Sequence, residues 1–161
     1  MSKDISKYSL TVNIKRDDGK ALVYYKQDGE RFESNCTIKM NVETTYTFLL
    51  NFRPPLKIKS GSLKNSGLEV KEEGFTPEAS SYSLLWTSND VVVSKNKGRD
   101  HFTLSLTVQD LGILEIPLQL KFYSANDKSH SVWGNELHHI EYDCIFKKDL
   151  FSFSIEKEMF R

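Results

Sequence analysis

Hydrophobic and polar residues alternate one by one in several stretches of the chain. The hydrophobic positions of these stretches are Tyr8, Leu10, Val12 and Ile14; Tyr46, Phe48, Leu50 and Phe52; Phe102, Leu104, Leu106 and Val108; Leu114, Ile116, Leu118, Leu120 and Phe122; Ile140, Tyr142, Cys144 and Phe146; and Phe151, Phe153 and Ile155. Because successive side chains of a β-strand point to opposite faces, this period predicts strands with one buried and one exposed face.

Turn signals separate these predicted strands. Asp28-Gly29 suits a tight hairpin, and Pro54-Pro55 ends the strand before it. We expect further strands near residues 68–71 and 82–87, and helix only in a turn or two at 155–160. Pro117 lies inside a strong strand pattern and cannot donate to a ladder, so that strand is predicted to be an edge or to carry a bulge. Residues 1–161 are therefore predicted to form a single all-β domain, an antiparallel β-sandwich or flattened β-barrel.

Charge and composition exclude several classes of protein. The 161 residues carry 22 basic and 22 acidic side chains, so the electrostatic signature of a nucleic-acid partner is missing. The first residues are polar, and no apolar run approaches the length of a membrane span. The two cysteines, Cys36 and Cys144, fit reduced thiols of a cytoplasmic protein. We expect a cytoplasmic protein that reaches the membrane only through a partner.

Residues 129–144 concentrate the side chains that could bind a metal ion. In a strand that starts at His138, the rings of His138 and His139 point to opposite faces, and His138 lies roughly 20 Å from Cys144. His130 could add one ligand by folding back. A zinc site needs its ligands around one point, so we predict no metal site and no cofactor. A hydrolase or metal enzyme that uses His130, His138 or Cys144 is the alternative.

Motifs for nucleophilic catalysis or nucleotide binding are equally weak. The chain has no G-x-S-x-G, P-loop or G-x-G-x-x-G sequence. Residues 94–97 fit S-x-x-K but read as a polar loop rather than the helix which that motif needs. Cys144 falls on an apolar face and is predicted to be a buried, inert thiol. We predict no catalytic residues and a protein that is not an enzyme.

The predicted inward faces are rich in aromatic side chains. Such rings either fill a solid core or leave a slot between the sheets for an apolar ligand such as a lipid tail, and composition alone leaves both open. The side chains expected to line this apolar interior are Tyr46, Phe48, Phe52, Leu104, Leu106, Leu118, Leu120, Phe122 and Tyr142.

A series of short motifs occurs in a recognisable order. It consists of D-G-E-R-F at 28–32, with Asp28, Gly29, Arg31 and Phe32; N-C-T-I-K at 35–39, with Thr37 and Lys39; Asp110, Gly112 and Glu115; K-F-Y at 121–123; Trp133-Gly134; and I-E-Y-D-C at 140–144, with Glu141, Tyr142 and Cys144. Over roughly residues 8–58 and 108–161 the chain resembles the cannabinoid receptor-interacting protein family. Pro117 and His138-His139 depart from the family pattern, which indicates a divergent member.

The resemblance implies a non-enzymatic cytosolic adaptor that binds the C-terminal tail of a G-protein-coupled, cannabinoid-type receptor and modulates its signalling. The family is also similar in architecture to Rho guanine-nucleotide dissociation inhibitors, which carry lipid-modified proteins. A carrier of acylated or prenylated cargo, such as a G-protein subunit, is therefore the alternative. A peptide could add to the edge strand bearing Pro117, or a lipid tail could enter between the sheets. We expect the partner to recruit the protein to the inner face of the plasma membrane.

Overall fold

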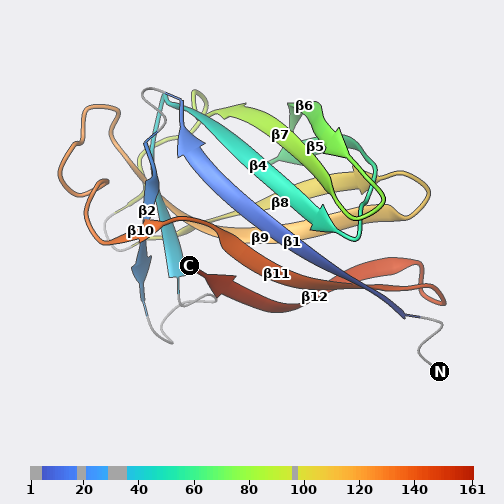
Figure 1. Ribbon diagram of the computed structural model, residues 1–161. Helices are drawn as coiled ribbons and strands as arrows, with labels where there is room; N and C mark the ends of the chain where they lie inside the picture. Colours follow the sequence, from blue (N-terminus) through green and yellow to red (C-terminus); the bar gives the residue numbers. More distant parts are fainter. Residues whose placement is uncertain (1–4, 18–20, 29–35, 96–97) are drawn as a thin grey trace.

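The computed structural model describes residues 5–17, 21–28, 36–95 and 98–161 and shows an all-β protein (Figure 1). The described residues contain no helix, and none is therefore long and apolar enough to cross a membrane. The strands of the described residues are β1 (Ile5–Arg16), β2 (Val23–Gln27), β3 (Cys36–Asn41), β4 (Thr45–Arg53), β5 (Ile58–Leu63), β6 (Ser66–Phe75), β7 (Ser80–Thr87), β8 (Asp100–Val108), β9 (Gly112–Tyr123), β10 (Asn135–Leu137), β11 (Ile140–Lys147) and β12 (Ser152–Phe160).

The strands form one sheet that curls into a nearly closed barrel. Its order is β10-β2-β3-β9-β8-β5-β6-β7-β4-β1-β11-β12, and its neighbours are antiparallel except for the parallel pair β3 and β9. The two ends of the sheet approach each other, because the ring of Tyr25 on β2 lies 5.1 Å from the ring of Phe160 on β12. Arg161 extends the pairing of β12 with β11 by backbone hydrogen bonds of 2.9 Å to His138 and His139.

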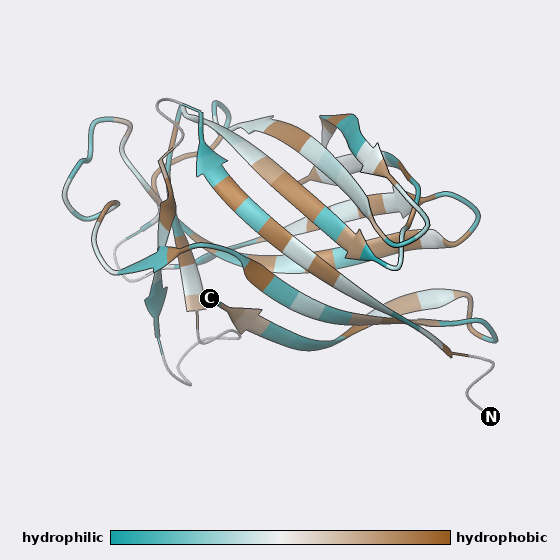
Figure 2. Ribbon diagram, viewed as in Figure 1, coloured by the Kyte–Doolittle hydropathy of each residue, from teal (hydrophilic) through white to brown (hydrophobic). Residues whose placement is uncertain are grey.

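The alternating sequence pattern places the core inside this barrel. Leu10, Val12 and Ile14 on β1 are almost fully buried, and the bands of opposite hydropathy along β1 are visible in Figure 2. Inside, the indole of Trp86 lies 6.3 Å from the ring of Tyr46 and 6.2 Å from that of Phe102. The predicted all-β, barrel-like fold is thus confirmed, and β6 and β7 occupy the regions predicted near 68–71 and 82–87.

Two local predictions are wrong. The strand with Pro117 is no edge strand, because β9 lies between β8 and β3. Pro117 pairs with Thr103 of β8 without a bulge. On its other side, the described pairing of β9 with β3 begins at Leu120. The segment 155–160 is strand rather than helix, because it pairs with β11. Asp28 is described, but Gly29 is not, so the predicted hairpin at Asp28-Gly29 lies partly outside the described residues.

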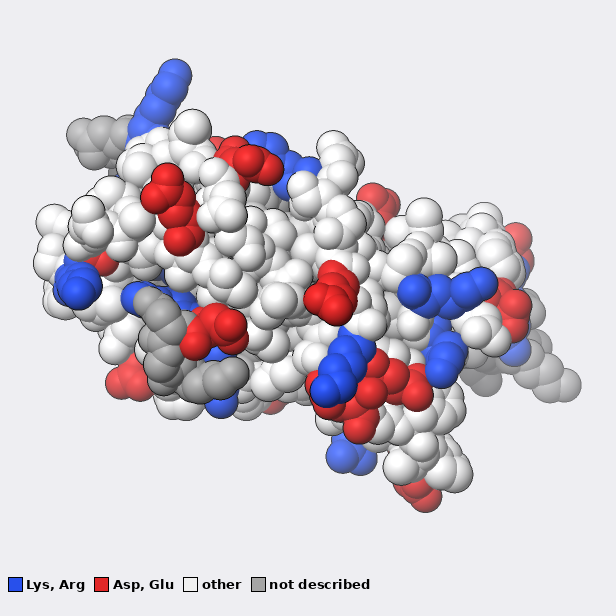
Figure 3. All heavy atoms as spheres, turned by 90° about the horizontal axis from the view of Figure 1, so that it is seen from above, with Lys and Arg blue, Asp and Glu red and all other residues white. Residues whose placement is uncertain are grey.

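The surface differs from one side of the barrel to another. On the face shown in Figure 3, acidic and basic side chains lie together in mixed groups. A broad uncharged area separates these groups. Basic side chains gather instead where β2, β3 and the end of β9 meet the loop 124–134. This part of the molecule also holds most of the described motif residues.

Candidate functional site

The candidate site lies around strand β3, which is buried on both of its faces. Ile38 and Met40 point into the barrel, whereas Thr37, Lys39 and Asn41 alternate with them and point outward, yet are also buried. Buried polar groups need partners, because an unpaired one loses its hydrogen bonds to water without compensation. The partners come from β2, from residues 98–99, from β9 and from the loop 124–134.

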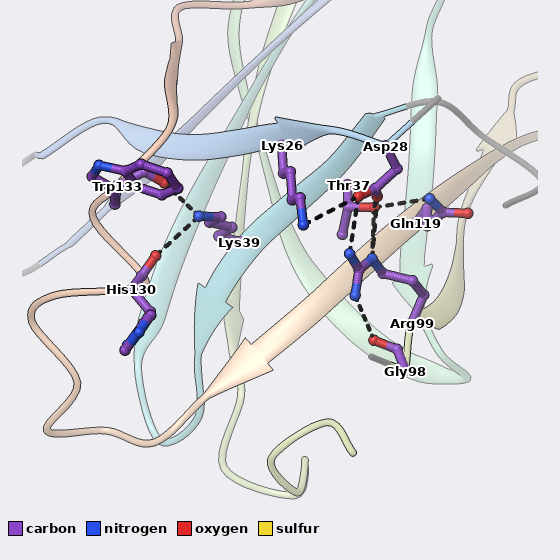
Figure 4. A network of polar contacts seen from close by, with 9 residues as sticks. All are labelled: Lys26, Asp28, Thr37, Lys39, Gly98, Arg99, Gln119, His130 and Trp133. Atoms are coloured by element: carbon purple, nitrogen blue, oxygen red, sulfur yellow. Dashed lines mark hydrogen bonds and ion pairs between the residues drawn. The ribbon is translucent and has the colours of Figure 1, made fainter. Parts of the chain in front are cut away.

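A buried ion pair lies at one end of this outward face (Figure 4). The guanidinium Nη2 of Arg99 is 3.0 Å from the Oδ1 of Asp28, and their side chains are only 5% and 2% exposed. The hydroxyl of Thr37 donates to Asp28 and accepts from Arg99 Nε at 3.0 Å and from Gln119 Nε2 at 2.9 Å. This network ties β2, β3, β9 and the segment before β8 together.

The network also keeps Asp28 ionised. Burial alone would raise the pKa of its carboxyl, but hydrogen bonds from Arg99 and Thr37, with the charges of Arg99 and Lys26, leave the pKa below its ordinary value of 3.8. Arg99 donates a further bond, from Nη1 to the carbonyl of Gly98 at 2.9 Å. The guanidinium is therefore held in one place, with its charge directed toward β3.

Lys39 organises the other end of the face by holding the loop 124–134. Its Nζ donates to the carbonyl of His130 at 3.0 Å and to the carbonyl of Trp133. The same Nζ lies 5.4 Å from the centre of the Trp133 ring and 5.9 Å from that of Tyr123, within the range of cation–π attraction. Lys39 is only 5% exposed. Its role in the described structure is thus to fix the position of Trp133.

The rest of the loop is held by short polar contacts. The side-chain amide of Asn41 donates to the carbonyls of Ser124 at 2.9 Å and Asp127 at 3.3 Å. Asp127 in turn accepts the backbone N–H groups of Ser129 and Ser131, each at 3.0 Å. Gly134 follows with a φ of +121°, a conformation that side chains other than glycine rarely adopt. The loop is therefore positioned by β3 rather than free.

Between these two anchors lies a recess of about 480 Å³, which we call the basic hollow. Its described lining carries four lysine or arginine side chains, the aromatic rings of Tyr123 and Trp133, and no aspartate or glutamate, while the ring of Phe122 packs in the core against Phe102. The lining residues are Lys26, Lys39, Val93, Ser94, Arg99, Lys121, Phe122, Tyr123, His130 and Trp133. A concave site with convergent polar groups and aromatic walls is the usual form of a ligand-binding pocket.

The positive charges in the basic hollow repel one another. Burial, and then the charges of Lys26, Lys121 and Arg99, lower the pKa of the Lys39 ammonium, while Asp127 acts in the opposite direction. The pKa of Lys121 is likewise lowered, first by burial and then by Arg99 and Lys26. A bound anion would relieve this repulsion. The hollow is therefore suited to an anionic group with an apolar neighbour.

The described motif residues fall into three places. At or next to the basic hollow lie Asp28, Thr37, Lys39, the K-F-Y motif at 121–123, Trp133 and Gly134, whereas Gly29, Arg31 and Phe32 lie outside the described residues. Asp110, Gly112 and Glu115 lie at the turn before β9 and at the start of that strand. The later motif lies on β11 and does not line the hollow. There Tyr142 and Cys144 face the core, and Glu141 on the outer face accepts a hydrogen bond from His139 at 2.8 Å.

All side chains predicted to line the apolar interior are buried. They are Tyr46, Phe48, Phe52, Leu104, Leu106, Leu118, Leu120, Phe122 and Tyr142. Neighbouring rings pack against one another: the centres of the Phe102 and Phe122 rings, for example, are 5.4 Å apart. That a lipid tail enters among these side chains stays a prediction.

The ligand-like residues of 129–144 do not converge. Among the described residues, no three His, Cys, Asp or Glu side chains are grouped so that they could hold one metal ion. His138 and His139 precede β11 rather than belonging to it, so the predicted strand start is two residues too early. Cys144 is buried as predicted, and burial, followed by the charge of Asp143, raises the pKa of its thiol to about 12.

Sequence reasoning does not identify Lys26, Arg99 and Gln119 as parts of this site. Arg99 lies in a polar segment 71 positions from Asp28, and nothing local marks it as a buried partner. The one usable signal is the alternation of Thr37, Lys39 and Asn41 with Ile38 and Met40. It indicates a polar outer face on β3, though not that other segments cover it.

Comparison with known proteins agrees with the motif series. Residues 4–160 match the family model described as CB1 cannabinoid receptor-interacting protein 1. The chain belongs to this family. It is 27% identical over 139 residues to CB1 cannabinoid receptor-interacting protein 1 of Mus musculus and 29% identical over 139 residues to that of Homo sapiens, with 84% of each chain covered in both comparisons. The Rattus norvegicus protein is 29% identical over 143 residues, which cover 87% of this chain and 86% of the relative. The predicted membership of the cannabinoid receptor-interacting protein family is thus confirmed.

Proposed function

We propose that this protein is a non-enzymatic signalling adaptor that binds the cytoplasmic C-terminal tail of a G-protein-coupled receptor of the cannabinoid type. Family membership supports a receptor partner, because the relatives are named for interaction with the CB1 cannabinoid receptor. The proposal includes a cytoplasmic location, recruitment to the inner face of the plasma membrane by the receptor, and modulation of its signalling.

The basic hollow is the observation that carries the proposal. Trp133 is 72% exposed at its edge, although a tryptophan of a soluble domain is usually largely buried. Exposed tryptophans beside basic residues are typical anchors of protein interfaces. We therefore place the receptor tail across the hollow, with an apolar side chain of the tail on the Trp133 ring and an acidic segment near Lys39 and Lys121.

Addition of the tail to a sheet edge is a less direct route. The strand expected to offer that edge, β9, lies inside the sheet order, where it pairs with β8 at Gly112–Leu120 and with β3 at Leu120–Tyr123. Among the described strands, the ends of the sheet order are β10 and β12, and β10 has only three residues.

Lipid entry into the barrel is tested with acylated and unacylated versions of one peptide, since equal affinity for both contradicts a lipid slot.

The test uses overlapping peptides that cover the cytoplasmic tail of the CB1 receptor, each prepared with and without phosphate on its serine and threonine residues. Binding to the purified protein is measured by fluorescence polarisation. We expect at least one peptide to bind, and Trp133→Ala to weaken it at least tenfold. Phe75→Ala is the matched control, because Phe75 is also an exposed aromatic residue but lies on β6.

Two results would contradict the proposal. If no peptide binds in either form, the receptor tail is not the partner. If Trp133→Ala and Phe75→Ala have the same affinity as the unchanged protein, the tail does not dock at the basic hollow.

A further inference from the structure

We propose that the basic hollow is a phosphoryl-binding site, and that its occupant is a phosphorylated serine or threonine of the receptor tail. This inference rests on the proposed function, since it names the chemistry by which the same surface recognises its partner. It adds a condition to that function, because a phosphate on the tail would then control whether the adaptor binds.

The charge of the described lining favours an anion. Four cations line the hollow, namely Lys26, Lys39, Arg99 and Lys121, and no carboxylate does. The nearest described carboxylates already have partners: Asp28 is paired with Arg99, Asp127 lies 3.6 Å from the ring of His130, and Asp100 accepts a hydrogen bond from Ser94 at 2.6 Å. A phosphorylated side chain, with a charge of about −1.5 to −2 at pH 7, would complement this cationic lining.

Donors for the phosphoryl oxygens are present at the rim and at the floor of the hollow. Lys26 is 58% exposed, and its Nζ is 3.9 Å from Asp28, so its flexible ammonium can reach into the recess. Lys121 lies with its Nζ 5.7 Å from the ring of Tyr123. Lys39 uses two of its three N–H groups on the carbonyls of His130 and Trp133, which leaves one for an anion.

The lowered pKa values of Lys39 and Lys121 agree with this assignment. Burial is the largest cause of both shifts, and repulsion by the neighbouring cations adds to it. An anion placed between the two ammonium groups would raise both pKa values again and bind more tightly for that reason.

The shape of the site favours a peptide over a membrane surface. Lys39 and the side chain of Arg99 are each 5% exposed, so their charge lies at the floor of a recess. A flat bilayer cannot approach this floor closely, whereas one side chain of a flexible peptide can enter it. Trp133 and Val93, both exposed at the edge, provide an apolar contact for the residues that flank the phosphate.

The experiment compares phosphorylated, unphosphorylated and glutamate-substituted forms of each tail peptide at a fixed ionic strength, because surface electrostatics depend on salt. The test variant carries Lys26→Gln and Lys121→Gln. The control variant carries Lys59→Gln and Lys71→Gln, two exposed lysines of β5 and β6, so that both variants lose the same charge. Vesicles with and without a phosphoinositide are titrated in parallel.

We expect the unchanged protein to bind the phosphorylated peptide at least tenfold more tightly than the other two forms. The test variant should reduce this preference to less than threefold, and the control variant should keep it. Equal affinity for all three forms overturns the inference, as does an equal loss of the preference in both variants. Vesicle binding through Lys26 and Lys121 without phosphopeptide binding overturns it in favour of a lipid headgroup.

Failure of the proposed function is a separate outcome. If no form of any tail peptide binds, the phosphoryl site is judged with inorganic phosphate by NMR on labelled protein. Saturable shifts of the Lys39 and Lys121 backbone amides that disappear in the test variant support the anion site, while unchanged spectra overturn it.

Discussion

At the scale of single residues, the site depends on charges that are buried and paired. Asp28 and Arg99 are almost fully buried, and Thr37 and Gln119 supply the remaining hydrogen bonds. Such a pair adds little stability over an apolar pair, but removing one partner leaves the other charge buried without compensation. Asp28 is therefore a residue whose loss should be costly although it touches no proposed ligand.

We predict that Asp28→Asn lowers the free energy of unfolding by about 3 kcal/mol, because the buried ion pair between Asp28 and Arg99 is lost. Urea unfolding followed by circular dichroism measures this loss. Lys57→Gln is the control, because the Lys57–Glu72 pair is exposed, and it should have a much smaller effect. An Asp28→Asn variant as stable as the unchanged protein would contradict the role of this pair.

The same pair predicts a dependence of stability on pH. The pKa of Asp28 is lower in the folded protein than the ordinary 3.8, so its contribution is complete above about pH 4. It is lost as the pH falls through the lower, folded value. The difference in unfolding free energy between the unchanged protein and Asp28→Asn should therefore be constant from pH 5 to 7 and shrink below pH 4. A difference that grows in acid would have the wrong sign.

Cys144 provides a second test at this scale. With a pKa of about 12, only about one in ten thousand of its thiols is ionised at pH 8. Burial, then Glu158 and Asp28, also raises the pKa of Cys36, but Cys36 is only half-buried. Iodoacetamide at pH 8 should therefore modify Cys36 before Cys144, as followed by mass spectrometry, and in urea both should react alike. Rapid labelling of Cys144 in the folded protein would contradict its burial.

At the scale of elements, the loop 124–134 links the fold to the site. Lys39 and Asn41 of β3 hold its carbonyl groups, so the loop presents Trp133 in a defined place. Gly134 lies against β2, directly before the strand β10 that pairs with it. A Cβ atom there would lie 2.9 Å from the carbonyl oxygen of Tyr25, and the φ of +121° would be strained as well.

Gly134→Ala is thus predicted to displace Trp133 and to weaken binding of the tail peptide at least fivefold, by fluorescence polarisation. Gly67→Ala on β6 is the matched control, because a Cβ atom there meets nothing within 4 Å. It should leave the affinity unchanged. If Gly134→Ala binds as well as Gly67→Ala, the position of the loop does not govern binding.

At the scale of the whole molecule, the sequence predicts the strands better than their order. The alternation of hydrophobic residues correctly predicts β1, β4, β8, β9 and β11, because each has one face on a common core. The parallel pairing of β3 with β9 joins Ile38 to Leu120, and a local pattern carries no record of such distant partners. The basic hollow is harder still, because it needs β2, β3, β9 and two loops together. The motif series nevertheless includes eight residues at or next to it.

The nearly closed barrel separates the possible binding routes in space. Its interior holds the aromatic side chains, its seam runs along β12, and the basic hollow lies outside β3. A tail that binds in the hollow leaves the core untouched, whereas a lipid tail must reach residues such as Leu104 and Leu118. Each route therefore changes the surroundings of a different set of backbone amides.

The most direct test of the account is an NMR titration of the ¹⁵N-labelled protein with the phosphorylated CB1 tail peptide. We predict that the shifted amides lie on β2 and β3, at Lys121–Tyr123 of β9 and in the loop 124–134, with Lys39 and Trp133 among the largest changes. Shifts concentrated on β12, or on Leu104 and Leu118 of the interior, would contradict the claim that the tail binds in the basic hollow.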